Sequence, residues 1–197
     1  MANVSASGVI HARLFGQIES KLHDMPEHGY DRTDHAILTH LQRDGRIANV
    51  DLADAVSLSP SSCLRRTKSL EADGIIAGYR AELDRDRAGL GLTIFIALKV
   101  EQHSRETSRL IEAALVAIPA VVACYVVSGE ADFLVEAAVP NLAAYEELLL
   151  DQVLAIGPVT DARSTFAIRT VLSRAPLPLG QLTHARLPGM VAEVGRK

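Results

Sequence analysis

The pattern of apolar residues in this chain changes at the glycines Gly89 and Gly91. Before these glycines they recur every three or four positions, as in amphipathic helices. After them an almost unbroken apolar run extends from Leu92 to Val100, a length that suits a buried strand. With 197 residues, the chain is long enough for two small domains. We therefore predict a helical domain before the glycines and a mixed domain after them.

Three short helices are expected in the first domain. We expect Asn49 to cap the second helix, which ends at Ser57–Leu58. The third follows Ser59–Pro60, because a capping serine followed by proline favours a helix start. Two short extended runs then predict a wing or a linking strand: Ile75–Ile76 and Tyr79–Leu83. Residues 31–84 therefore predict a winged helix-turn-helix.

The third helix has the pattern of a DNA-reading helix. We expect Leu64, Thr67 and Leu70 to face the core. The opposite face is expected to carry hydroxyls and guanidinium groups, which bind phosphates and guanine edges. With the nearby lysine, this set comprises Ser62, Arg65, Arg66, Lys68 and Ser69. Residues 61–70 contain three cations and no acid, although a solvated helix face is the ordinary explanation of such a run.

The second domain is expected to follow the order strand, helix, strand, strand, helix, strand. We place the helices after Ser104 and over 142–156, and the strands at 92–100, 121–127, 133–139 and 164–172. This order is typical of a ferredoxin-like βαββαβ sandwich, here over residues 85–175. The fold class is therefore α+β.

Two further segments flank these domains. Residues 1–30 are an N-terminal extension with apolar positions every four residues, which predicts an arm helix. Met25 is an alternative start of the natural chain. Residues 176–197 contain several prolines and glycines and are expected to form a C-terminal tail without regular structure.

Composition excludes several classes of protein. The chain is 48% hydrophobic and 22% charged, which excludes general disorder. No apolar run is long enough to span a membrane, and no signal peptide is evident, so we expect a cytoplasmic protein without a membrane partner. The net charge of −4 does not favour binding of the whole chain to nucleic acid. Binding to DNA would therefore depend on a local cluster of positive charge.

No catalytic or metal-binding motif is present in the sequence. Cys63 and Cys124 are far apart and are expected to be small apolar side chains. The seven histidines do not have the spacing of metal ligands. We therefore expect no enzyme activity, no catalytic residues, no metal and no cofactor.

One turn in the second domain has the chemistry of a small-molecule site. Ser128, Gly129, Glu130 and Asp132 offer backbone N–H groups beside carboxylates, which suit the two charged ends of an amino acid. An ordinary hairpin turn favours the same residues and is the alternative interpretation.

Together, these residues resemble the Lrp/AsnC (leucine-responsive, or feast/famine) family of transcription regulators. The resemblance covers roughly Asp31 to Leu172. It rests on motifs in both halves of the chain: Asp31-Arg32-Thr33-Asp34, Leu41-Gln42-Arg43-Asp44-Gly45-Arg46, Leu58-Ser59-Pro60-Ser61, Leu70-Glu71, Gly78-Tyr79, Val127-Ser128-Gly129 with Asp132, and Val139-Pro140 with Tyr145.

The resemblance implies a DNA-binding regulator of amino-acid metabolism or transport genes, modulated by an amino acid. It implies that Ser61, Ser62, Arg65, Arg66 and Ser69 face double-stranded DNA. It also implies that an amino-acid effector binds near the loop Val127, Ser128, Gly129, Glu130 and Asp132. Glu130 and Ala131 depart from the Asp and the aromatic residue frequent there. The family forms dimers and octamers or similar rings.

Two other functions are consistent with the same residues. One is an architectural DNA-binding protein that responds to no effector. The other is an amino-acid-binding protein or enzyme built on the ferredoxin-like half.

Overall fold

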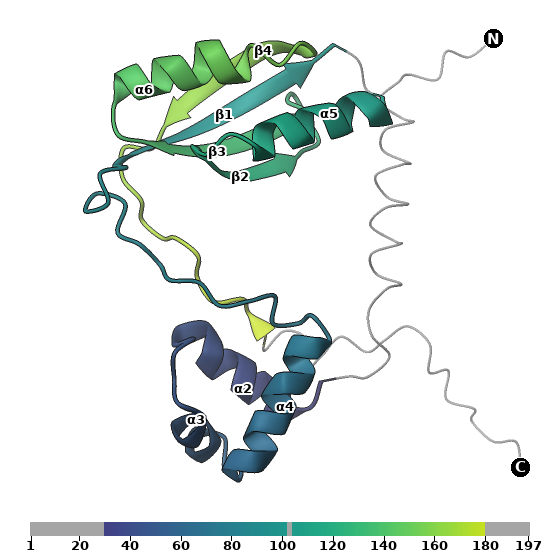
Figure 1. Ribbon diagram of the computed structural model, residues 1–197, viewed down its shortest axis with the longest axis vertical. Helices are drawn as coiled ribbons and strands as arrows, with labels where there is room; N and C mark the ends of the chain where they lie inside the picture. Colours follow the sequence, from purple (N-terminus) through teal and green to yellow (C-terminus); the bar gives the residue numbers. More distant parts are fainter. Residues whose placement is uncertain (1–29, 102–103, 180–197) are drawn as a thin grey trace, which may run out of the picture. The chain divides into compact units, whose positions relative to one another are not determined.

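The computed structural model describes residues 30–101 and 104–179, which belong to two compact units. A helical unit includes the described residues up to Arg80 and the segment from Pro176, and an α/β unit comprises Ala81–Ala175 (Figure 1). The expected arm helix, up to residue 29, and the tail from residue 180 lie outside the described residues.

The helical unit contains α2 (Arg32–Arg43), α3 (Asn49–Ala55) and α4 (Pro60–Ala72). The expected start of α4 is confirmed: the Ser59 side chain accepts a hydrogen bond from the Ser62 N–H, and Pro60 is the first helical residue. The expected cap at Asn49 is wrong, because Ala48 is the N-cap of α3. Asn49 instead donates its side-chain N–H to the carbonyl oxygen of Pro60 at 2.9 Å.

The core of the helical unit corrects the expected inner face of α4. Its buried side chains are Ile37, Leu38, Leu52, Ala53, Cys63 and Leu70. Leu64, expected to face inward, is 44% exposed. Cys63 is seven positions before Leu70 and therefore shares its face, whereas Leu64 lies about 120° around the helix from Leu70. The cysteine, rather than the leucine, fills the core.

The two expected wing strands do not form. Residues 75–83 have turn and irregular backbone. A two-stranded ribbon of two and five residues has too few ladder hydrogen bonds to be stable alone. Tyr79 nevertheless holds this segment to α4, since its hydroxyl donates to Glu71 Oε1 at 2.9 Å. Burial and this hydrogen bond raise the pKa of Tyr79 to about 12.

The α/β unit confirms the expected ferredoxin-like order. It comprises β1 (Leu92–Val100), α5 (Arg105–Val116), β2 (Val121–Val126), β3 (Phe133–Val139), α6 (Leu142–Glu147), the π-helix η1 (Leu148–Val153) and β4 (Val159–Phe166). The sheet is antiparallel with strand order β2-β3-β1-β4. Figure 1 shows the helices on one face of this sheet.

The last strand is shifted from its expected position at 164–172. β4 pairs with β1 from Val100–Val159 to Ile94–Phe166, and in this register β1, which begins at Leu92, has no residue opposite 169–172. Ile168, Val171 and Leu172 resemble strand residues in sequence but are highly exposed. Their high strand propensity is not sufficient to form a strand, because they have no neighbouring strand to pair with.

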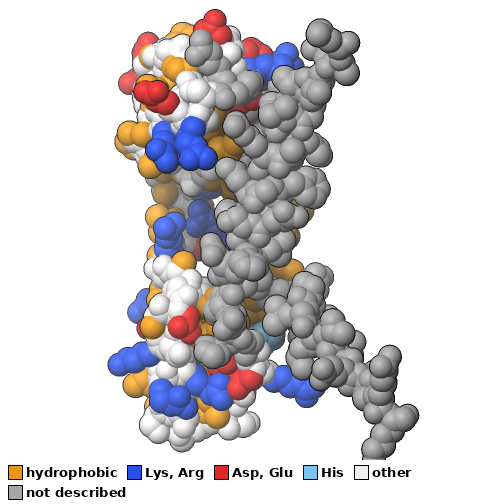
Figure 2. Space-filling view, turned by 90° about the vertical axis from the view of Figure 1, so that its right-hand side faces the viewer, with side chains coloured by type: hydrophobic (Ala, Val, Ile, Leu, Met, Phe, Trp, Pro, Cys, Tyr) orange, Lys and Arg blue, Asp and Glu red, His pale blue; other side chains and the backbone are white. Residues whose placement is uncertain are grey.

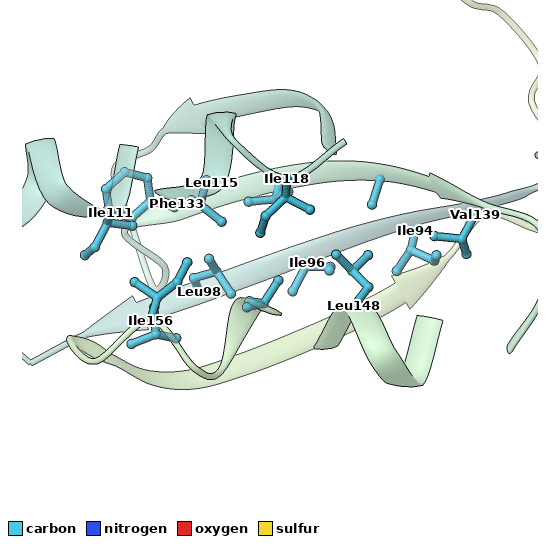
Figure 3. Close-up of a cluster of buried hydrophobic side chains, with 14 residues drawn as sticks. Ile94, Ile96, Leu98, Ile111, Leu115, Ile118, Phe133, Val139, Leu148 and Ile156 are labelled. Atoms are coloured by element: carbon cyan, nitrogen blue, oxygen red, sulfur yellow. The ribbon is translucent and has the colours of Figure 1, made fainter. Parts of the chain in front are cut away.

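The core of the α/β unit lies between the sheet and its helices (Figure 3). Alternate side chains of β1, namely Ile94, Ile96 and Leu98, are fully buried. They meet Ile111 and Leu115 from α5 and Leu148 from η1. The other face of β1 carries Phe95, and among the described residues no helix covers that face of the sheet, which is called here the sheet face without helices.

Candidate nucleic-acid interface and effector loop

The helix α4 presents a polar, cationic surface on the side opposite its buried residues. Cys63 and Leu70 fix the inner face by packing in the helical core. Four of the six predicted DNA-facing residues are exposed: Ser61, Arg65, Lys68 and Ser69. Two cations and two hydroxyls on one helix surface match the contacts that phosphates and guanine edges accept.

Arg66 lies differently from Arg65. Its Nη1 is 2.8 Å from Asp31 Oδ2 and 2.8 Å from Asp34 Oδ1, both at the start of α2. Hydrogen bonds to these carboxylates raise the pKa of Arg66, and its side chain is only 28% exposed. The pKa of Asp31 is lowered, first by the Asp34 backbone N–H and also by Arg66. Arg66 therefore ties the recognition helix to α2, and its predicted DNA contact stays a prediction.

The predicted hydroxyls belong to local networks. Ser62 is half-buried and accepts a hydrogen bond from the Ser59 hydroxyl at 3.0 Å. The Ser61 and Ser59 hydroxyl oxygens are 3.2 Å apart. Ser69 donates to Asp73 Oδ2 at 3.5 Å. Ser61 and Ser69 are exposed as well as hydrogen-bonded, so they keep a surface from which to reach a phosphate.

The surface of the helical unit is not uniformly positive. Figure 2 shows its Lys and Arg side chains with Asp and Glu among them. The exposed part of α4 differs, since its first three turns contain no acid. The local charge of the helix, rather than the net charge of the chain, favours an anionic partner there.

The loop between β2 and β3 holds the predicted effector residues together. The Val127 N–H donates to the Asp132 carbonyl at 3.0 Å, and the Asp132 N–H donates to the Leu98 carbonyl at 2.9 Å. The Asp132 carboxylate accepts the Val100 N–H at 2.9 Å. Asp132 therefore anchors the loop to β1, while Ser128, Gly129 and Glu130 are exposed.

The structure adds Arg163 of β4 to this loop. Its Nη1 lies 4.0 Å from Glu130 Oε2, and its Nε lies 3.1 Å from Asp161 Oδ2. Both Glu130 and Arg163 are mostly exposed, so the pair contributes little to stability. Sequence reasoning missed Arg163 because only the pairing of β4 with β1 brings it near residue 130.

The sheet face without helices borders a groove of about 1220 Å³ within the α/β unit. Phe95 and Tyr125 lie on this face and are 38% and 56% exposed. Arg85 crosses it, with Nη2 2.7 Å from Glu136 Oε1 and Nη1 donating to Thr93 Oγ1 at 2.9 Å. Exposed aromatic rings beside polar and charged side chains are typical of a surface that binds a protein partner.

Metal-binding and membrane-spanning features differ from the sites above. Residues 30–101 and 104–179 contain no cluster of three metal-ligating side chains. In the same ranges, no helix has the length and hydropathy needed to cross a membrane. Cys63 is buried and Cys124 half-buried, and both are free thiols.

Comparison with known proteins gives a match in each half of the chain. Residues 30–77 match the family model described as a winged helix-turn-helix DNA-binding domain. Residues 93–177 match the model described as an Lrp/AsnC ligand-binding domain. The two matches cover the two predicted functional regions in the same order.

Relatives that match about three quarters of the chain agree. The chain is 35% identical to the leucine-responsive regulatory protein of Salmonella typhimurium, over 74% of this chain and 89% of that protein. It is also 35% identical to the Bkd operon transcriptional regulator of Pseudomonas aeruginosa, over 76% of this chain and 97% of that one.

Among solved structures, a transcriptional regulator from Neisseria meningitidis in complex with L-methionine has a TM-score of 0.75 and 36% identity, covering 78% of this chain and 99% of that chain. An AsnC family regulator from Agrobacterium tumefaciens has a TM-score of 0.74 and 33% identity, with the same coverage. The fold, the recognition helix and these relatives agree, and the chain belongs to the Lrp/AsnC family of transcriptional regulators.

Proposed function

We propose that this protein binds specific DNA sites through α4 and regulates genes of amino-acid metabolism or transport in response to an amino acid. In this proposal, residues 31–84 bind DNA and residues 85–175 bind the effector and pair subunits. The observation that carries it is the exposed surface of the first three turns of α4, which contain Arg65 and Lys68 and no acid. A recognition helix with such a surface contacts base edges in the major groove.

A titration onto DNA tests this proposal. The purified full-length chain is titrated onto duplex DNA from upstream of its own gene, with a scrambled competitor, at about 150 mM salt because affinity depends on ionic strength. Repeating the titration with pooled amino acids tests the response to an effector. Specific binding that one pool shifts supports the proposal. Equal binding to scrambled DNA in all conditions favours the architectural alternative.

The proposed effector is a small α-amino acid bound at the loop 127–132. Two observations support it: the family model for the α/β unit is a ligand-binding domain, and the similar Neisseria regulator was solved with L-methionine. Glu130 and Arg163 offer opposite charges 4.0 Å apart, which suits the ammonium and carboxylate groups of one amino acid.

Calorimetric titration of the twenty common amino acids tests the effector site. One or a few should release or absorb heat, and Arg163→Gln should weaken the same titration. Arg109→Gln is a matched control, because Arg109 is also an exposed arginine of the α/β unit but lies on α5, outside both the loop and the groove. Absence of heat with every amino acid up to millimolar concentration would contradict the effector part of the proposal.

We also propose that two copies pair through the sheet face without helices. Phe95 and Tyr125 support this, since their exposed rings on one face lose water contact when a second sheet packs there. A two-fold dimer would present two copies of α4 to two half-sites on DNA.

A further inference from the structure

Leu64 is an exposed apolar side chain on the cationic surface of the recognition helix. Its side chain is 44% exposed, although the sequence pattern placed it in the core. Within the described helical unit, it is not among the apolar residues packed against the core. Nearly half of Leu64 is therefore open to a partner of α4.

The neighbours of Leu64 set it apart from other exposed leucines. Residues three and four apart lie next to each other on a helix, so Leu64 lies between Ser61 and Lys68. Both of these are exposed, as is the adjacent Arg65. A single apolar residue on a protein surface is ordinary. An apolar residue that borders two side chains proposed to bind DNA would approach DNA together with them, and an apolar group is its natural counterpart there.

That counterpart is the methyl group of thymine. It is the apolar group that base pairs present in the major groove, where A·T and T·A pairs differ by its position. Leu64 lies in the second turn of α4, and the N-terminal part of a recognition helix is the part that contacts base edges. Burying a methyl group against Leu64 would remove apolar surface of both partners from water.

We propose that Leu64 is a specificity-determining residue that recognises a thymine methyl group in each half-site. This inference rests on the proposed function, because it needs α4 in the major groove. It assigns to Leu64 a preference for a base, whereas Arg65 and Lys68 also serve contacts with phosphate.

The test compares the sites that two proteins select. The full-length chain and Leu64→Ala each select from a pool of random-sequence DNA duplexes. We expect the natural chain to enrich thymine at one fixed position in each half-site. Leu64→Ala should select the same site with no preference at that position, and Leu64→Met, which keeps an apolar side chain, should retain part of it.

Deoxyuridine then isolates the methyl group. It pairs like thymidine and lacks only the C5-methyl. In the selected site, this replacement should weaken binding of the natural chain on the order of 3- to 10-fold and leave the affinity of Leu64→Ala unchanged. Val116→Ala removes an exposed valine from α5 and is the control, expected to respond to deoxyuridine like the natural chain.

The outcomes separate the two proposals. If the natural chain enriches no sequence, the proposed sequence-specific function is wrong. If it enriches a site, but Leu64→Ala selects the same base at every position and responds equally to deoxyuridine, the function stands and the role of Leu64 is overturned. Equal melting temperatures of Leu64→Ala and the natural chain show that the variant is folded.

Discussion

At the scale of single residues, two adjacent arginines differ in what they contact. Arg65 is exposed on α4, whereas Arg66 is held by Asp31 and Asp34 at 2.8 Å each. The two arginines are equivalent in the sequence pattern. Their side chains leave the helix about 100° apart, and they therefore meet different surroundings. The first is a proposed DNA contact and the second a positioning residue for the recognition helix.

The two arginines should respond differently to substitution. Arg65→Ala should weaken binding to the specific site by about 1–3 kcal/mol and leave the melting temperature unchanged. Arg66→Ala should lower the free energy of unfolding by about 1–2 kcal/mol, because it leaves two carboxylates at the start of α2 without their cation. Thermal denaturation and DNA titration of both variants measure this. Arg66→Ala with natural stability but weakened DNA binding would contradict the positioning role.

The lowered pKa of Asp31 predicts a dependence of stability on pH. A carboxylate whose pKa is lower in the folded state stabilises the fold above its unfolded pKa, near 3.8, and this contribution is lost as pH falls through the folded pKa. Asp31→Asn keeps a good N-cap but removes the charge. Its deficit in stability should therefore be present at pH 6 and shrink below about pH 4. Asp54→Asn on the exposed face of α3 is the control in the same denaturant titrations, and a deficit of Asp31→Asn that stays constant with pH would contradict the prediction.

At the scale of elements, the turn between α3 and α4 carries local strain. Ser57 has φ = 57°, in the left-handed region that glycine adopts readily and other residues do not. Its N–H donates to the Asp54 carbonyl at 3.2 Å, and the Leu58 N–H donates to the Ala53 carbonyl at 2.9 Å. These hydrogen bonds end α3 and direct the chain into Ser59 and α4. They offset the unfavourable backbone conformation of Ser57.

Replacement of Ser57 by glycine should relieve this strain. We expect Ser57→Gly to raise the free energy of unfolding by about 0.5–1 kcal/mol, after the larger entropy of glycine in the unfolded chain is subtracted. Chemical denaturation measures the change. Ser108→Gly is the control, because Ser108 lies within α5, where glycine is unfavourable and should destabilise. A loss of stability in Ser57→Gly would show that the serine side chain is needed in the turn.

At the scale of the whole molecule, the chain uses one core for each unit. The helical core contains Cys63 and Leu70, and the α/β core contains Ile96 and Leu115, each fully or almost fully buried. The proposed work of the protein also divides in this way, with DNA bound by one unit and the effector and partner subunit by the other. The exposed sheet face with Phe95 is the surface on which the proposed assembly depends.

A charge on that sheet face should prevent pairing. Phe95→Glu would bury a carboxylate when two sheets pack together, and an uncompensated buried charge is strongly unfavourable. Light scattering after size-exclusion chromatography should therefore give a lower mass for this variant than for the natural chain. Val50→Glu, on the exposed surface of α3, should keep the natural mass. A natural mass in Phe95→Glu would place the subunit interface elsewhere.

Local sequence patterns are sufficient to predict the two kinds of unit and most elements within them. The Ser59–Pro60 start of α4, the strand Leu92–Val100 and the start of α5 after Ser104 follow from short-range capping and periodicity, and the structure confirms each. These features depend on neighbours in the chain, which a sequence displays directly.

Ion-pair partners and strand register depend on residues far apart in the sequence, and the tertiary structure sets them. The partners of Arg66 lie about thirty residues earlier in the chain, the register of β4 is set by β1, and Arg163 reaches Glu130 only through that register. The prediction that Leu64 faces the core is wrong for the same reason. Hydrophobicity alone does not show which of two adjacent apolar residues, Cys63 or Leu64, packs in the helical core. Helical phase relative to a packing partner, strand register and ion pairing are long-range choices, and only the folded chain makes them.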